Sequence, residues 1–339
     1  MSKSPEILAR VYRGDAVEAV HYGAIAVVNG KGRLTHAVGD PHEPFMTRSS
    51  IKPFQLMPLL VSGAADHYGF TPRQLAVMCG SHTGGDDHHR VVSSNLGLAD
   101  CGPENLRCGC HWPLGMQTDK KYPLDGEDQD PVRHNCSGKH SGFLALTRFF
   151  GDDVEEYLNP ASRTQQMAKR ILSDFCAYPV EKMPTGTDGC SAPNWPLPPY
   201  NLALGFMKLA NRQADAGVSA EILSRIRGAM TTYPEMVSGE KRLDLDLARS
   251  FSPRLICKVG AESIEGIGLS DPPLGIAVKI YDGNQRALGA VCVSVLKQLG
   301  IIENIEGFPL LIRHKRPEIR NYRDFLTGHI ETEFELREV

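Results

Sequence analysis

The clearest chemical signal in the sequence is Arg48-Ser49-Ser50-Ile51-Lys52-Pro53, in which a serine precedes a lysine by three positions. On a helix this spacing places both side chains on one face. Pro53 puts the start of that helix near Ser49 or Ser50, because proline is tolerated in a first turn and not deeper. A lysine with the ordinary pKa of about 10.4 is protonated at pH 7, so it must be buried or set near another cation before it can activate a serine. The pattern predicts a serine nucleophile with a lysine base, although a capping serine beside a solvated lysine has the same spacing.

Four later segments also gather polar and reactive side chains in loops. They are 79–89, with Ser81 and several histidines; 134–142, with cysteine, lysine and histidine; 186–193, with aspartate and cysteine; and Lys258-Val259-Gly260, which follows an apolar run. Such loops suit a substrate pocket. Each one taken alone also fits an ordinary turn, helix cap or solvated lysine, so the interpretation depends on their combination.

Strand-like segments at both ends of the chain must position these loops around a helical middle. Alternating runs and an Asn-Gly turn predict a hairpin within residues 7–39, and core spacing predicts helices within 140–178 and 200–230. Further strands are expected at 255–259, 274–280 and 287–296, whereas 183–199 is too rich in glycine and proline to be either element. The sequence predicts an α+β fold, with an antiparallel sheet of N- and C-terminal strands and a helical region packed on it.

Composition narrows the class of function. The chain has 339 residues, 41% of them hydrophobic, and a formal net charge of -3, so no basic field suggests a nucleic acid or a membrane as partner. The first 19 residues lack the apolar core of a secretory signal. Nine cysteines are an odd number in a chain too large to need disulfide staples. We expect a cytoplasmic protein with a small-molecule substrate.

Together and in this order, the five segments resemble the rhizobial-type L-asparaginases, also called the asparaginase II family, from Tyr22-Gly23 to about residue 328. That family is similar in fold to glutaminases and serine β-lactamases. The resemblance implies a homodimeric amidohydrolase that converts L-asparagine to L-aspartate and ammonia. We expect one catalytic domain over 1–339, with sheet-forming parts at about 5–45 and 253–339 and a helical, loop-rich middle at about 50–250.

The resemblance also implies roles for individual residues. Ser49 with Lys52 and Ser81 with Lys258 match the two serine and lysine tandems, Arg48, His140 and Asp188 match substrate-binding positions, and Cys136, Lys139 and Cys190 match a zinc site beside the pocket. Glu262-Ser263 stands where the family pattern predicts glutamate followed by glycine, which weakens the assignment of Lys258.

Zinc is the only cofactor implied, and its donor set is unusual because lysine can ligate only when it is neutral. Cys108, Cys110 and His111 form a compact run that offers a competing zinc site. We favour the separated trio, with zinc positioning the substrate and not activating water.

The expected reaction is acyl transfer in two stages. Ser49 attacks the side-chain amide while Lys52 takes its proton, ammonia leaves, and water hydrolyses the acyl-enzyme. Ser81 and Lys258 relay protons or lower the pKa of Lys52, and backbone N–H groups near Ser49 or Ser81 hold the oxyanion. The sequence leaves open which serine is the nucleophile.

Three alternatives also remain open. A glutaminase would differ by one methylene in its substrate. A β-lactamase-like hydrolase shares the Ser-x-x-Lys and Lys-x-Gly elements. A zinc-structured binding protein would use the same cysteines and histidines for folding alone.

Overall fold

The computed structural model describes residues 5–119 and 129–339, and the chain divides into two compact units. The first unit comprises Met1–Ser50, Leu197–Asn211 and Ser250–Val339, and the second comprises Ile51–Pro196 and Arg212–Arg249. A division by compactness does not measure independent folding, so the single catalytic domain stays a prediction.

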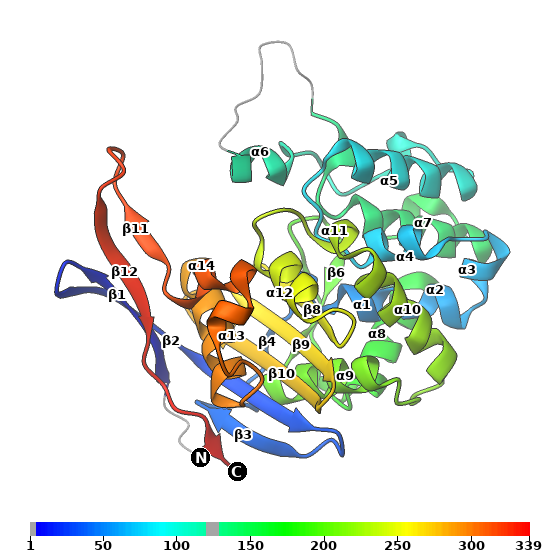
Figure 1. Ribbon diagram of the computed structural model, residues 1–339. Helices are drawn as coiled ribbons and strands as arrows, with labels where there is room; N and C mark the ends of the chain where they lie inside the picture. Colours follow the sequence, from blue (N-terminus) through cyan, green and yellow to red (C-terminus); the bar gives the residue numbers. More distant parts are fainter. Residues whose placement is uncertain (1–4, 120–128) are drawn as a thin grey trace. The chain divides into compact units, whose positions relative to one another are not determined.

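The first unit is built on an antiparallel sheet (Figure 1). Its strands are β1 (Glu6–Arg13), β2 (Ala16–Asn29), β3 (Leu34–Val38), β8 (Leu255–Gly260), β9 (Ile264–Ser270), β10 (Pro273–Ile280), β11 (Glu318–Arg320), β12 (Leu326–Thr332) and β13 (Arg337–Glu338). The main order is β11-β12-β1-β2-β10-β9-β8, with β3 paired to β2 and β13 to β3. Strands from the two ends of the chain pair directly, β1 with β12 and β2 with β10. The predicted α+β class with an antiparallel sheet of N- and C-terminal strands is confirmed.

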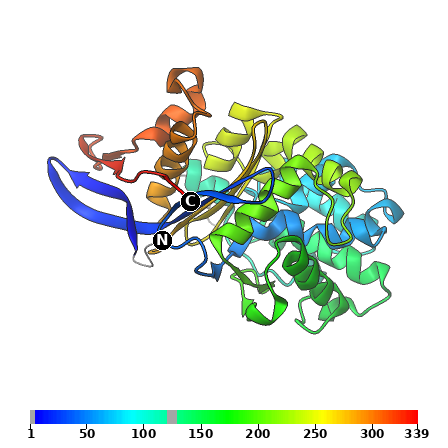
Figure 2. The same cartoon turned by 90° about the horizontal axis from the view of Figure 1, so that it is seen from below.

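Helix α9 (Pro199–Asn211) packs closely on one face of this sheet because that face carries glycines. A Cβ on Gly268 would lie 2.3 Å from the carbonyl oxygen of Phe206, and one on Gly275 would lie 2.0 Å from that of Ala203. Residues of β10 that alternate with Gly275, such as Ile276 and Val278, are fully buried on the other face. Helix α13 (Leu288–Gln298) contacts β1, β10 and β12 there (Figure 2).

The strand predicted at residues 287–296 is wrong, since this segment forms α13. Its run of alanine, leucine and valine is short and apolar throughout, and such a run does not distinguish a buried strand from a buried helix. The turn at Gly283, with φ of 75°, ends β10, and a 3-10 turn at Gln285–Ala287 leads into the helix. β9 and β12 were not predicted.

The second unit is mainly helical. Its helices are α1 (Lys52–Gln55), α2 (Met57–Val61), α3 (Ala64–His67), α4 (Pro72–Met78), α5 (Asp86–Leu98), α6 (Leu114–Asp119), α7 (Ser137–Phe149), α8 (Arg163–Phe175), α10 (Ala220–Thr232) and α11 (Pro234–Val237). The predicted helical ranges 140–178 and 200–230 are each divided into two helices, and the range 183–199 holds only two-residue strands, as β5 (Gly186–Thr187), β6 (Pro193–Asn194) and β7 (Pro196–Leu197).

Three short elements complete the chain: β4 (Phe45–Met46), α12 (Leu243–Phe251) and α14 (Ile312–Lys315). Among the residues described, none of the helices combines the length and the apolar character needed to cross a bilayer.

Candidate active site

Ser81 lies in the loop that joins α4 to α5. Its backbone N–H donates to the carbonyl oxygen of Val237 at 2.8 Å, and the N–H of His82 donates to that of Asn135 at 3.2 Å. Two segments that are distant in sequence therefore hold this loop in place. Because both amides already have acceptors, the oxyanion donors expected near Ser81 are not these two groups in the present arrangement.

Lys52 begins α1, directly after a 3-10 turn at Arg48–Ile51, which agrees with the predicted helix start. Its side chain is fully buried. The Nζ atom lies 3.0 Å from Ser81 Oγ and 3.2 Å from Cys136 Sγ, and it donates to the carbonyl oxygens of Gly80 and, at 3.4 Å, Asn135. The structure therefore places Lys52 in contact with Ser81, the serine that the family resemblance pairs with Lys258.

Ser49 and Lys258 belong to the first unit, where their segments meet. Lys258 is fully buried in β8, and its Nζ donates to the carbonyl oxygen of Val259 at 2.7 Å. At the end of that strand, a Cβ on Gly260 would lie 2.6 Å from the carbonyl oxygen of Thr47. The glycine of the Lys-x-Gly element thus lets the strand end pack against the turn that carries Ser49.

Where the sequence departs from the family pattern, at Glu262-Ser263, both residues adopt a left-handed backbone conformation. Ser263 has a φ of 57° and Glu262 a φ of 61°, in the left-handed region that glycine favours. Ser263 is buried and its hydroxyl donates to the carbonyl oxygen of Asn284 at 3.1 Å. Arg48, also at positive φ, lies 3.8 Å from the Glu262 carboxylate.

The three residues predicted to bind zinc come together in the second unit with two predicted pocket residues. Lys139 Nζ lies 3.0 Å from Cys190 Sγ, and Cys136 contacts Lys52 as described above. Asp188, half-buried, has its Oδ2 atom 4.0 Å from Cys190 Sγ. Both cysteines and Lys139 are buried.

Charge in this cluster is distributed unevenly between the two thiols. The pKa of Cys190 is lowered far below its ordinary value by a hydrogen bond with the Cys136 thiol and by the positive charge of Lys139. The pKa of Cys136 is raised by the same hydrogen bond and by burial. Burial alone would lower the pKa of Lys139, but the nearby Cys190 and Cys136 sulfurs raise it instead. These shifts favour a thiolate at Cys190 facing an ammonium at Lys139.

His140 is fully buried next to this cluster. It is oriented by Tyr157, a residue that the sequence did not indicate. Its Nδ1 lies 2.7 Å from the hydroxyl of Tyr157, which accepts a hydrogen bond from the backbone N–H of Arg107 at 2.8 Å. Among the described residues His140 Nε2 has no hydrogen-bond partner. Burial lowers the pKa of His140 although the interaction with the Cys190 sulfur opposes this shift, so the neutral imidazole is favoured. No local sequence pattern marks Tyr157.

The competing run of Cys108, Cys110 and His111 does not form a compact ligand set. Cys108 is buried and Cys110 is exposed. Burial raises the pKa of Cys108 to about 12, which keeps the thiol protonated. The two ring nitrogens of His111 face Trp112 and Asn135.

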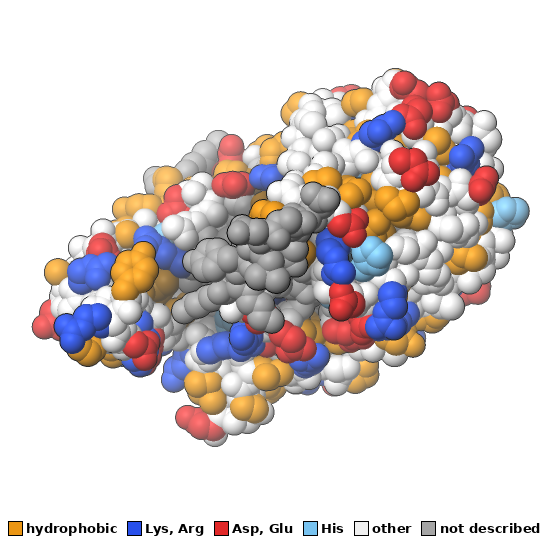
Figure 3. Space-filling model, turned by 90° about the horizontal axis from the view of Figure 1, so that it is seen from above, with side chains coloured by type: hydrophobic (Ala, Val, Ile, Leu, Met, Phe, Trp, Pro, Cys, Tyr) orange, Lys and Arg blue, Asp and Glu red, His pale blue; other side chains and the backbone are white. Residues whose placement is uncertain are grey.

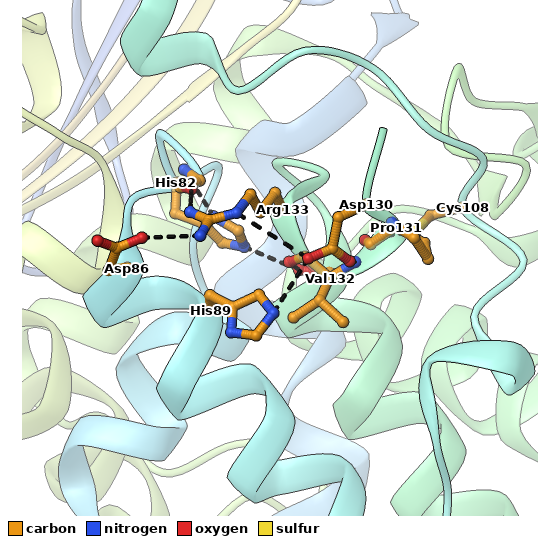
Figure 4. A network of polar contacts seen from close by, with 10 residues as sticks. His82, Asp86, His89, Cys108, Asp130, Pro131, Val132 and Arg133 are labelled. Atoms are coloured by element: carbon orange, nitrogen blue, oxygen red, sulfur yellow. Dashed lines mark hydrogen bonds and ion pairs between the residues drawn. The ribbon is translucent and has the colours of Figure 1, made fainter. Parts of the chain in front are cut away.

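A network of charged side chains contacts the loop that follows Ser81 (Figure 4). Arg133 donates to the carbonyl oxygen of Gly84 at 2.8 Å and to the carboxylate of Asp86 at 2.7 Å. Asp130 accepts from the backbone N–H of Val132 at 2.8 Å and lies 3.0 Å from His89 Nε2. No sequence motif connects these residues.

A surface groove of about 330 Å³ runs beside this network. It is lined by Asp86, Trp112, Pro113, Met116, Gln129, Asp130 and Arg133. Figure 3, which views the molecule from above, shows side chains of both charges mixed with apolar ones on this face. All of the charged lining residues belong to the network, so the groove adds no separate constellation.

A family model of L-asparaginase II matches residues 9–332. The chain belongs to the L-asparaginase II family. Membership implies a hydrolase that acts on a small-molecule amide, which agrees with the family that the sequence motifs resemble.

Solved structures similar to this family member are more distant. A crystal structure of Mglu is 16% identical to this chain, with a TM-score of 0.39, and the match covers 82% of this chain and 67% of the Mglu chain. For the L-glutamate-binding form of Mglu the TM-score is 0.41, and the match covers 59% of the Mglu chain. The penicillin-binding protein homologue from Pyrococcus abyssi, described as octameric, is 14% identical with a TM-score of 0.35, covering 89% of this chain and 80% of that one. The chain spans about two thirds or less of the Mglu chains. No curated protein matches the chain.

The zinc site expected for an L-asparaginase II can be tested against the donor atoms present. Two sulfurs, one of them held as a thiolate, suit zinc. Lys139 lies 3.0 Å from that thiolate but carries a proton, so it can ligate only by releasing it. The residues fit zinc on this condition.

Proposed function

We propose that this chain hydrolyses L-asparagine to L-aspartate and ammonia through an acyl-enzyme on serine, with Lys52 as the general base. The observation that carries the proposal is the fully buried Lys52 amine 3.0 Å from the hydroxyl of Ser81, in a chain of the L-asparaginase II family. Burial disfavours the ammonium form, which is the form that cannot accept a proton.

The surroundings of Lys52 also orient its amine. A neutral amine has two N–H donors and one lone pair. The carbonyl oxygens of Gly80 and Asn135 only accept, whereas Ser81 Oγ at 3.0 Å and Cys136 Sγ at 3.2 Å can donate or accept. In this proposal the amine donates to the two carbonyls, and its lone pair accepts the proton of the nucleophile.

The proposed reaction keeps Ser49 as the nucleophile. Its oxygen forms a bond to the amide carbon, its proton passes to Lys52, and the carbon–nitrogen bond breaks as the leaving nitrogen takes a proton and departs as ammonia. Water then cleaves the ester and restores the serine. Ser81, in contact with Lys52, and Lys258 relay protons between these steps.

Substrate binding uses the remaining predicted residues. In this proposal the Arg48 guanidinium pairs with the substrate carboxylate and Asp188 with its ammonium, while His140 Nε2 supplies one further polar contact. Cys136, Lys139 and Cys190 would hold zinc. When bound, the ion supplies a fixed positive charge that positions the substrate. A homodimer, which the family resemblance implies, and a cytoplasmic location are part of the same proposal.

Ammonia release from the purified protein tests the proposal, with L-asparagine and L-glutamine as parallel substrates. We expect turnover of asparagine, and a mass increase on one serine after rapid quenching. Ser49→Ala should remove that adduct. An adduct that persists in Ser49→Ala and disappears in Ser81→Ala would transfer the nucleophile to Ser81, and no ammonia from either substrate, even with zinc added, would favour a zinc-structured binding protein.

A further inference from the structure

The proposed mechanism assigns no role to His111, yet this side chain is tied to the backbone beside the base. Nδ1 lies 2.6 Å from the carbonyl oxygen of Trp112, and Nε2 lies 3.2 Å from the backbone nitrogen and 3.0 Å from the side-chain Oδ1 of Asn135. Because a carbonyl oxygen only accepts, Nδ1 carries the proton and Nε2 accepts from the backbone N–H of Asn135. In this tautomer Oδ1 is a neighbour of Nε2 and not a hydrogen-bond partner, so His111 holds Asn135 through its backbone N–H.

The carbonyl group of the same residue reaches the catalytic arrangement. Asn135 O accepts from Lys52 Nζ at 3.4 Å and from the backbone N–H of His82 at 3.2 Å. Lys52 Nζ lies 3.0 Å from Ser81 Oγ. One carbonyl thus contacts both the amine of Lys52 and the residue that follows Ser81, and a rotation of the Asn135 peptide would disturb both.

A second imidazole supports this turn. His134 Nδ1 accepts from the backbone N–H of Cys136 at 3.0 Å, and the ring centroids of His134 and His111 are 4.2 Å apart at an angle of 56°. The two rings contact the N–H groups of consecutive residues: His134 holds the Asn135–Cys136 peptide, which contains the Asn135 carbonyl, and His111 holds the peptide before it. Together they fix the turn at Asn135.

The geometry points to His111 as a positioning residue that fixes the Asn135 carbonyl and, through it, the orientation of the Lys52 amine toward Ser81. This inference rests on the proposed function, in which Lys52 is the general base. His111 does not touch the substrate in this role and does not bind the metal. Its loss should therefore slow the chemical step while leaving substrate affinity and zinc content unchanged.

Three substitutions in the zinc-loaded protein separate this role from simple packing. His111→Leu removes both hydrogen bonds, and we expect kcat to fall about tenfold, as the loss of one orienting hydrogen bond permits, with KM changed less than about twofold. Glutamine can place its oxygen near the position of Nε2 and accept from Asn135, whereas asparagine reaches only the position of Nδ1. His111→Gln should stay within about threefold of the original kcat, and His111→Asn should be as slow as His111→Leu.

His67→Leu is the matched control, because His67 is an exposed histidine whose ring contacts Phe149 edge-on, and the kcat of this variant should not change. Zinc content and the thermal midpoint are measured for every variant. Loss of zinc from all three His111 variants would make His111 a ligand and would overturn the inference. Equal kcat values for the glutamine and asparagine variants would also overturn it. If His111→Leu does not fold, the comparison of those two still decides. An original protein that turns over no asparagine would contradict the proposed function itself, whereas an active protein insensitive at His111 contradicts the inference alone.

Discussion

The segments around Ser81 and around Ser49 are held in different ways. Ser81 and Lys52 are buried and depend on hydrogen bonds from distant parts of the chain, through Val237 and Asn135. Around Ser49 the structure depends on backbone conformation, with positive φ angles in the flanking turns and a glycine where a strand meets a turn. The first region should be sensitive to the loss of polar groups, and the second to the addition of a single carbon atom.

The largest effect should follow the loss of the buried amine. Lys52→Met keeps the length of the side chain but removes the base, and we expect kcat to fall by about 10²–10⁴. The thermal midpoint should change by only a few degrees, because burying an apolar group avoids the desolvation cost of the polar amine while two carbonyls lose a donor. Ammonia release and calorimetry measure the two effects.

Lys182→Met, at an exposed lysine of the same unit, is the control and should leave both quantities unchanged. A Lys52→Met protein with more than about a tenth of the original kcat could not be reconciled with general-base catalysis by this residue.

The second prediction addresses the region around Ser49. Gly260→Ala would put a Cβ 2.6 Å from the carbonyl oxygen of Thr47 and 3.1 Å from the nitrogen of Ser50. Such a contact forces the turn to move, so we expect the free energy of unfolding to fall by about 1–3 kcal/mol, together with a loss of activity. Denaturant titration measures the change.

The same substitution at Gly97 is the matched comparison. This glycine lies within α5 with no atom near its Cβ position, so Gly97→Ala should stabilise the protein by about 0.5–1 kcal/mol. Equal effects at the two positions would mean that the approach of Thr47 to Gly260 does not constrain the turn.

The sequence predicted the sheet more successfully than it predicted the contacts of the site. Alternating strands and an Asn-Gly turn are local signals, and β2 with β3 forms the expected hairpin. The contact of Lys52 with Ser81 joins residues 29 positions apart, and nothing in the Ser-x-x-Lys spacing indicates it. Ser49 and Lys52 are close in the chain, which favoured their pairing, but a buried amine binds whichever acceptors the fold brings to it.

The residues that support the site could not be predicted from the sequence for the same reason. Tyr157 and Arg133 contact residues that are distant in sequence, and their own neighbours carry no motif. Asn135 lies within the segment 134–142 that the sequence singled out, but nothing in that segment indicates its contact with Lys52. The conformation at Ser263 could be suspected, because the family pattern predicts glycine there. That a serine accepts the same φ required the structure.

The third prediction concerns pH and the buried histidines of the Ser81 loop and α5. Burial lowers the pKa of His82 and His88 below the ordinary value of about 6.5, so the unfolded chain binds protons first as the pH falls. Stability is complete above that pH and is lost below it, with a slope of up to about 1.4 kcal/mol per pH unit for each histidine.

His88→Gln should make this slope shallower, because its amide can still donate to the carbonyl oxygen of Glu235, which His88 Nε2 contacts at 2.8 Å. Urea unfolding between pH 5 and pH 7 measures it. His67→Gln, at an exposed ring, should keep the original slope, and a His88→Gln slope as steep as the original would show that His88 is not a neutral buried group.

The smallest effect sharpens the contrast at Ser263. Alanine is ordinarily preferred to glycine by about 1 kcal/mol, but at a φ of 57° it keeps the strain that glycine avoids. Both Ser263→Ala and Ser263→Gly lose the hydrogen bond to Asn284, so that loss cancels between them. Ser263→Gly should therefore be the more stable by about 1 kcal/mol, measured by denaturant titration. If the alanine variant were equally stable, the turn would have relaxed out of the left-handed region, and the backbone would not be what holds the Ser49 region in place.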